Sequence, residues 1–61
     1  MDGLHGPAVA LTARESQLVG LARTGLSNAE MADRLLLSVR TVETHIYRAM
    51  HKLGINDRRD F

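Results

Sequence analysis

The sequence contains no cysteine. This absence excludes the disulfide bridges that stabilise small secreted domains, and it excludes thiolate metal clusters and thiol nucleophiles. The chain also lacks any apolar run near the roughly 20 residues that span a bilayer, and no signal-peptide pattern opens it. We therefore expect a soluble, intracellular, cytoplasmic type of domain without membrane contact.

The chain is also short, with 61 residues. Folding at this length buries only about 60% of the surface that the unfolded chain exposes, which is too little to enclose a large substrate cavity. His45 and His51 are six positions apart and miss the i, i+4 spacing of a helical metal site. No serine has an acid–histidine pair to activate it. We expect one small domain that is not an enzyme and uses no metal or cofactor.

The net charge of +1 conceals an uneven distribution. Residues 1–37 carry three cations and four acids, whereas residues 38–61 carry five cations and three acids. The second part is therefore basic. This asymmetry favours a polyanionic partner only weakly, because an ordinary solvated surface can show it too.

Three hydroxyl residues mark the starts of three predicted helices. Thr12 with Glu15 and Ser27 with Glu30 each form the pattern of a capping box, and Ser38 is a third candidate N-cap. Residues 1–10 show no periodicity and are expected to form a leader before a domain at 11–61. The predicted helices cover residues 12–24, 28–35 and 39–53.

Glycines and apolar stripes complete the helical pattern. Gly25 and Gly54 are expected to stop the first and third helices. A fourth helix capped by Asn56 or Asp57 would be truncated at Phe61, which is expected to be exposed together with Val9 and Leu36. The apolar stripe of the third helix comprises Val39, Val42, Ile46, Ala49, Met50 and Leu53.

The short connection between the second and third helices indicates a helix-turn-helix. Ala32, at the fifth position of the second helix, allows the two helix axes to approach each other, and Val42 fills the space between them. Many helix-turn-helix sequences have glycine in the turn, whereas this chain has Leu36. A slightly different turn geometry is therefore expected.

The polar face of the third helix carries a strip of Arg40, Thr44, Tyr47 and His51 at i, i+4, i+7 and i+11. These side chains suit contacts with base edges and phosphates in a DNA groove. The plain alternative is the solvated face of any amphipathic helix. Glu43 lies beside the strip, where a carboxylate can accept a hydrogen bond from cytosine N4 or orient Arg40 or Tyr47.

The region from Leu11 to Arg58 resembles the C-terminal DNA-binding domain of LuxR-type, or GerE-like, transcription regulators. Four blocks in register carry this resemblance: Leu11-Thr12-Ala13-Arg14-Glu15, Gly25-Leu26-Ser27-Asn28-Ala29-Glu30-Met31-Ala32, Leu37-Ser38-Val39-Arg40-Thr41-Val42-Glu43-Thr44-His45, and Lys52-Leu53-Gly54-Ile55. One departure is Glu43, where the family often has lysine.

The resemblance implies an all-α, three-helix helix-turn-helix bundle with a truncated fourth helix. It also implies a bacterial regulator that binds double-stranded DNA as a homodimer in the full-length protein and contacts RNA polymerase. Because the fourth helix usually supplies the dimer contact, the isolated chain is expected to be monomeric. By motif position, the base-contacting residues are Glu43, Thr44 and Tyr47. The phosphate-contacting residues are Asn28, Arg40, Thr41, Arg48 and Lys52.

Two alternatives stay open. One is region 4 of a bacterial sigma factor, which shares the capped first helix and the helix-turn-helix. The other is a helical protein-interaction module that never touches DNA, as the low net charge and Glu43 would allow.

If the chain binds DNA, three or four cations near phosphates predict that the logarithm of affinity falls with the logarithm of salt concentration, with a slope of about −3 per chain.

Overall fold

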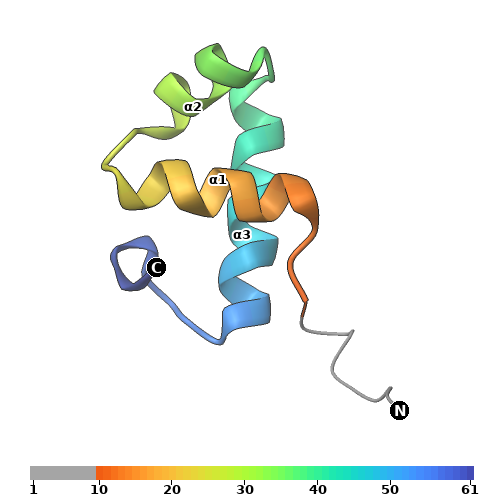
Figure 1. The fold of residues 1–61 in the computed structure, drawn as a ribbon, viewed down its shortest axis with the longest axis vertical. Coiled ribbons are helices and arrows are strands. Elements are labelled where there is room, and N and C mark those ends of the chain that lie inside the picture. Colours follow the sequence, from red (N-terminus) through yellow and green to blue (C-terminus); the bar gives the residue numbers. More distant parts are fainter. Residues whose placement is uncertain (1–9) are drawn as a thin grey trace.

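The computed structural model describes residues 10–61, most of which lie in three α-helices. In Figure 1, α1 crosses α3, and α2 lies near the end at which α3 begins. This arrangement confirms the predicted all-α three-helix bundle, although the expected fourth helix is only a single 3-10 turn. The elements are α1 at Ala13–Arg23, α2 at Asn28–Leu35, α3 at Val39–Leu53 and η3 at Arg58–Asp60.

Each α-helix begins after the hydroxyl residue that the sequence predicts as its cap. Thr12 Oγ1 accepts a hydrogen bond from the Glu15 N–H at 3.1 Å, and Glu15 Oε1 accepts one from the Thr12 N–H at 2.9 Å. Ser27 and Glu30 repeat this reciprocal pair. Ser38 Oγ accepts from the N–H of the third helical residue of α3 at 3.0 Å. These bonds satisfy N–H groups that lack a partner within the helix.

The ends of α2 and α3 share one hydrogen-bonding pattern, although one uses leucine and the other glycine. Leu36 has φ 58° and ψ 42°, and Gly54 has φ 70° and ψ 29°. In both, the next N–H bonds a carbonyl five residues earlier, as Leu37 does with Ala32 at 2.9 Å. The expected departure in turn geometry is therefore wrong: Leu36 adopts the left-handed conformation that glycine favours, because these bonds require it.

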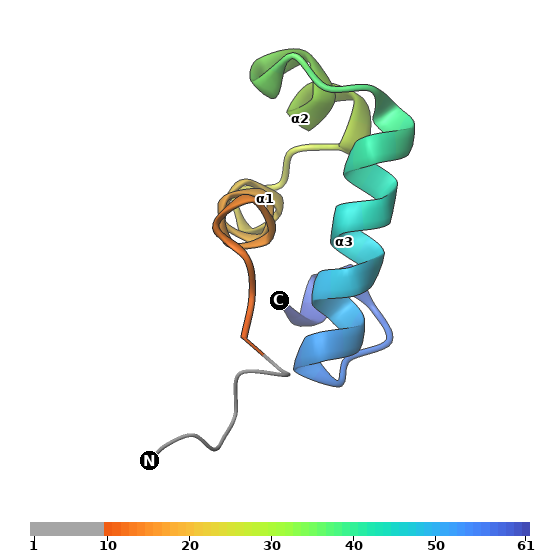
Figure 2. The same cartoon turned by 90° about the vertical axis from the view of Figure 1, so that its right-hand side faces the viewer.

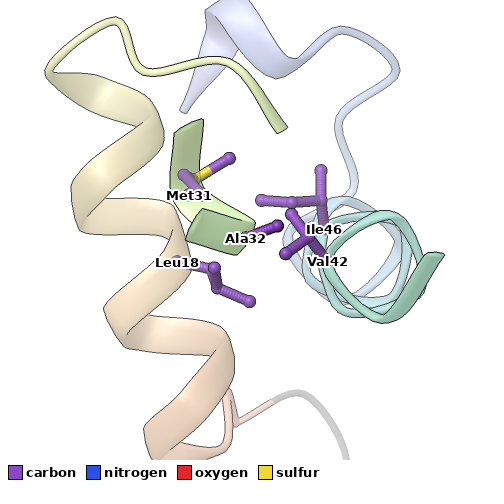
Figure 3. Close-up of a cluster of buried hydrophobic side chains, with 5 residues drawn as sticks. All are labelled: Leu18, Met31, Ala32, Val42 and Ile46. Atoms are coloured by element: carbon purple, nitrogen blue, oxygen red, sulfur yellow. The ribbon is translucent and has the colours of Figure 1, made fainter. Parts of the chain in front are cut away.

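The core lies where the three helices meet. Figure 3 shows the Ala32 side chain directed toward Val42 and Ile46, as the short spacing between α2 and α3 predicts. The small side chain of Ala32 therefore sets how closely the two helices approach. The core cluster consists of Leu18, Met31, Ala32, Val42 and Ile46.

Three apolar residues differ from expectation. Val39 and Leu53, at the two ends of the α3 stripe, are 42% and 43% exposed and lie outside the core cluster. Phe61 is not exposed but half-buried against the core cluster. Leu36 is 90% exposed, as expected. Residues 1–9 of the expected leader, which include Val9, lie outside the described residues. No helix within residues 10–61 is both long and apolar enough to cross a bilayer.

Candidate nucleic-acid interface

One side of α3 is left uncovered by the other helices. Figure 2 shows α1 and α2 packed on the same side of α3, so that its opposite side faces outward. The four residues of the polar strip are all exposed on α3, and Tyr47 is 71% exposed. The strip that the sequence predicts is therefore a continuous accessible surface. It comprises Arg40, Thr44, Tyr47 and His51.

Three side chains in the strip have defined local partners. The Thr44 hydroxyl donates to the Arg40 carbonyl at 3.1 Å, so its proton is engaged while its methyl group and an oxygen lone pair remain available. The rings of Tyr47 and His51 are nearly parallel, with an interplanar angle of 11° and centroids 6.4 Å apart. No hydrogen bond within residues 10–61 engages the phenol hydroxyl of Tyr47, which can act as donor or acceptor.

Glu43 is exposed at the margin of the strip. Among the side chains of residues 10–61, no hydrogen bond or ion pair joins Glu43 to Arg40 or Tyr47. The structure therefore does not support the idea that Glu43 orients either neighbour. Its carboxylate is an unshared acceptor on a surface that otherwise carries cations and hydroxyls.

Three of the predicted phosphate-contacting residues lie near the start or along the side of α3. Arg40 and Arg48 are exposed, and no carboxylate within the described part of the chain pairs with either guanidinium. Thr41 is half-buried, and its Oγ1 accepts a hydrogen bond from the Ser38 hydroxyl at 2.9 Å. The Thr41 hydroxyl keeps its own proton for an outside acceptor.

Lys52, a fourth predicted phosphate contact, is held by a carboxylate on α1. Its Nζ lies 2.7 Å from Glu15 Oε1, the oxygen that also accepts the Thr12 N–H. Glu15 is only 2% exposed, and Lys52 is 25% exposed. The Lys52 hydrogen bond, followed by that of the Thr12 backbone, keeps the pKa of Glu15 below its ordinary value, although burial opposes this shift. The pairing is 37 residues apart in sequence, and no local pattern predicts it.

Asn28, the fifth predicted phosphate contact, is the first residue of α2 and is half-buried. Its Oδ1 accepts a hydrogen bond from Arg58 Nη1 at 2.5 Å, and Arg58 Nη2 donates to the Leu26 carbonyl at 3.0 Å. Arg58 thereby fastens η3 to the α1–α2 connection. Sequence reasoning missed this role, since Arg58 counted only as one cation of the basic half.

The neighbouring arginine has a purely local partner. Arg59 Nη2 lies 2.7 Å from Asp57 Oδ2, and the Arg59 N–H donates to Asp57 Oδ1 at 2.9 Å. These bonds cap η3 and lower the pKa of Asp57 to about 2. Asp57 is thus the cap that the sequence offers as one of two candidates.

His45 is half-buried, and its Nδ1 is buried without a hydrogen-bond partner in the described structure. Within residues 10–61, no cluster of three or more histidine, cysteine or acidic side chains is arranged to hold a metal ion.

The chemistry available on the exposed side of α3 is that of hydrogen-bond donors, a few acceptors and unpaired guanidinium groups. That set suits a polyanion with base edges.

Comparisons with known proteins identify a family for this chain. The family described as "Bacterial regulatory proteins, luxR family" matches residues 9–61. The "DNA-binding transcriptional activator DevR/DosR" of Mycobacterium tuberculosis is 40% identical over 52 residues, which are 85% of this chain. The chain spans 24% of the length of that relative.

Proposed function

The chain belongs to the LuxR family of bacterial regulatory proteins as a helix-turn-helix DNA-binding domain, and from this premise we propose that α3 is the recognition helix. The observation that carries the proposal is the exposed strip on the side of α3 that α1 and α2 leave free (Figure 2). A major groove is wide enough to admit such a helix.

Membership of the family also decides between the alternatives left open by the sequence. The domain is LuxR-type and not sigma factor region 4, and it belongs to DNA-binding regulators and not to protein-interaction modules. The family is one of regulators without enzymatic activity, as the sequence predicts.

We assign base contacts to Glu43, Thr44 and Tyr47. The Thr44 hydroxyl is committed to the Arg40 carbonyl, so Thr44 presents an acceptor lone pair and a methyl group, which suit an exocyclic amino group and a thymine methyl. Tyr47 offers its hydroxyl on an exposed ring. The unshared carboxylate of Glu43 suits the amino group of cytosine, which donates to acidic side chains in the major groove.

The phosphate contacts differ in how they work. Arg40 and Arg48 supply unpaired positive charge, whereas Thr41 and Asn28 supply neutral donors. The N-terminus of α2 adds free N–H groups and the positive end of the helix dipole. Lys52 contributes least, because Glu15 already neutralises it. Two unpaired cations predict a salt slope of about −2 per chain, lower in magnitude than composition implies.

A slope of this size indicates weak binding by a single domain. We infer that the full-length regulator binds as a homodimer to two half-sites about one helical turn apart, while the isolated chain is monomeric. A contact with RNA polymerase fits the description of its mycobacterial relative as a transcriptional activator. Such a regulator works in the bacterial cytoplasm, at the nucleoid.

Selection of bound sequences from random duplexes tests the proposal. We expect the original chain to enrich a short motif, and we expect variants that lack the α3 strip residues not to enrich it. Mobility-shift titration provides the complementary measurement. The absence of any shift at low salt, or affinity that does not change between low and physiological salt, would contradict groove binding by α3.

A further inference from the structure

The Arg58 guanidinium donates hydrogen bonds to two neutral acceptors. Its Nη1 donates to Asn28 Oδ1 at 2.5 Å and its Nη2 donates to the Leu26 carbonyl at 3.0 Å. Within the described residues no carboxylate pairs with Arg58, in contrast to Arg59, which pairs with Asp57. Both acceptors flank the N-cap of α2, where the proposed phosphate contact lies.

This contact settles the orientation of the Asn28 amide. An asparagine amide has an acceptor oxygen and a two-proton donor group on opposite arms of one plane. Because the oxygen accepts from a cation, a flipped amide would place its own donor group against the guanidinium. The Nδ2 group therefore stays on the arm away from Arg58, and no hydrogen bond within residues 10–61 engages it.

The same end of α2 favours an anion. The first N–H groups of a helix have no partner in the helix, and the dipole is positive there. The Ser27 and Glu30 side chains satisfy only part of this set. A phosphate at this position meets the Nδ2 donor together with the remaining N–H groups.

We propose that Arg58 is a positioning residue for DNA binding, which fixes Asn28 so that its amide donors face a backbone phosphate. The inference rests on the proposed phosphate contact of Asn28 and adds that Arg58 acts through this residue without touching DNA. It gives the C-terminal turn η3 a part in DNA binding.

Affinity for a 24-base-pair duplex of arbitrary sequence tests the proposal, because phosphate contacts do not depend on sequence. Asn28→Ala and Arg58→Met should each weaken binding about fivefold to tenfold, as for one lost charge-assisted hydrogen bond. The double variant should bind like Asn28→Ala alone. Effects that multiply, or full binding by Arg58→Met beside weakened Asn28→Ala, would overturn the positioning role. Full binding by Asn28→Ala would overturn the phosphate contact itself.

The salt dependence separates positioning from direct contact. Loss of a neutral donor releases no counterion, so Arg58→Met should leave the salt slope unchanged, whereas a direct phosphate contact would reduce its magnitude by about 0.9. Arg58→Lys keeps the charge but has no fork to bridge two acceptors, so it should also bind weakly. Wild-type binding by Arg58→Lys would contradict positioning. Arg59→Met is the matched control and should keep affinity within about twofold, since Arg59 pairs with Asp57.

A measurement on the unmodified chain guards against variants that do not fold. In the absence of DNA, the side-chain amide of Asn28 should be as rigid as the backbone by ¹⁵N heteronuclear NOE. Asn56, which is exposed, provides the internal comparison and should be mobile. The signals of the two Asn28 Nδ2 protons should shift on addition of the duplex. An Asn28 amide as mobile as that of Asn56 would refute the proposal.

Discussion

A single carboxylate oxygen serves two distant parts of the chain. Glu15 Oε1 accepts the Thr12 N–H, which completes the cap of α1, and it also accepts Lys52 Nζ from the last turn of α3. The side chain is 2% exposed. A buried charge of this kind requires both partners, because an ion left unpaired away from water is costly. Glu15 is therefore both a local cap and a tertiary contact.

Acid should destabilise the domain through this group. The folded-state pKa of Glu15 is lowered from an ordinary value of 4.5, so its stabilising effect is complete above that value. As pH falls below 4.5, the unfolded chain takes up the proton first, and the free energy of unfolding decreases. Glu15→Gln should cost about 1–2 kcal/mol at pH 7 and flatten this dependence in urea titrations. Glu30→Gln is the control and should lose less stability, because in the described part of the chain the Glu30 side chain bonds only its own N-cap residue.

Replacement of Leu36 by glycine should stabilise the domain. A left-handed leucine costs about 1–2 kcal/mol, and the extra chain entropy of glycine in the unfolded state costs about 0.5–1 kcal/mol. Because Leu36 is 90% exposed, little burial is lost. Leu36→Gly should therefore raise the free energy of unfolding by up to about 1 kcal/mol. Gly54→Ala, at the equivalent place in α3, should lower it. Destabilisation by Leu36→Gly would show that the turn does not hold this conformation in solution.

Sequence preference should depend on Thr44 and Tyr47. Replacement of either by alanine removes a proposed base contact and should reduce discrimination between cognate and mismatched duplexes by about 1–3 kcal/mol. Competition titrations with selected duplexes measure this difference. His51→Ala, on the same strip but without an assigned base, should preserve the preference. Equal loss of preference in all three variants would indicate a change in α3 packing instead.

At the scale of the element, the helix boundaries follow from short-range chemistry. Thr12, Ser27 and Ser38 each lie three residues before the N–H that they cap, and this spacing is visible in sequence. The helix end at Leu36 is harder to foresee. Its left-handed conformation goes with hydrogen bonds from the Leu36 and Leu37 N–H groups to carbonyls of α2, whereas a leucine side chain does not predict that conformation.

Loss of a helix cap should lower stability without changing the DNA affinity of the folded domain. Ser27→Ala removes the hydroxyl that accepts the Glu30 N–H and should cost about 1 kcal/mol of stability. Ser16→Ala, at an exposed position inside α1, is the control and should cost little. Thermal unfolding measures both. The folded fraction of the Ser27→Ala variant should bind DNA with nearly the affinity of the original chain. A loss of affinity beyond that caused by unfolding would show that Ser27 contacts the phosphate.

The candidate site was only partly predictable. The α3 strip follows from helical periodicity, because residues three and four apart share a face. The partners of Lys52 and Asn28 do not follow from it, since Glu15 and Arg58 are 37 and 30 residues away. The LuxR-type resemblance marks Lys52 as a phosphate contact by motif position alone. Only the crossing of α1 over α3 reveals its carboxylate partner.

At the scale of the whole molecule, DNA binding should respond to salt less than the cation count implies. Arg48→Met should reduce the magnitude of the salt slope by about 0.9, since Arg48 is unpaired in the described structure. Lys52→Met should change the slope much less and instead lower stability. Glu43→Lys should steepen the slope and strengthen non-specific binding. Isothermal titration over a salt series tests all three, and a larger slope change at Lys52 than at Arg48 would reverse the assignment.

The methyl group of Ala32 separates the two parts of the DNA-binding surface. It packs against Val42 and Ile46 and so sets the distance between the α2 N-terminus, at the proposed phosphate, and the α3 strip (Figure 3). A larger residue there would move one contact set relative to the other by the width of a methyl group. In the proposed binding mode, the register between the phosphate contacts and the base contacts thus depends on a residue inside the protein core. A substitution at Ala32 should therefore change the preferred duplex, although Ala32 itself is buried.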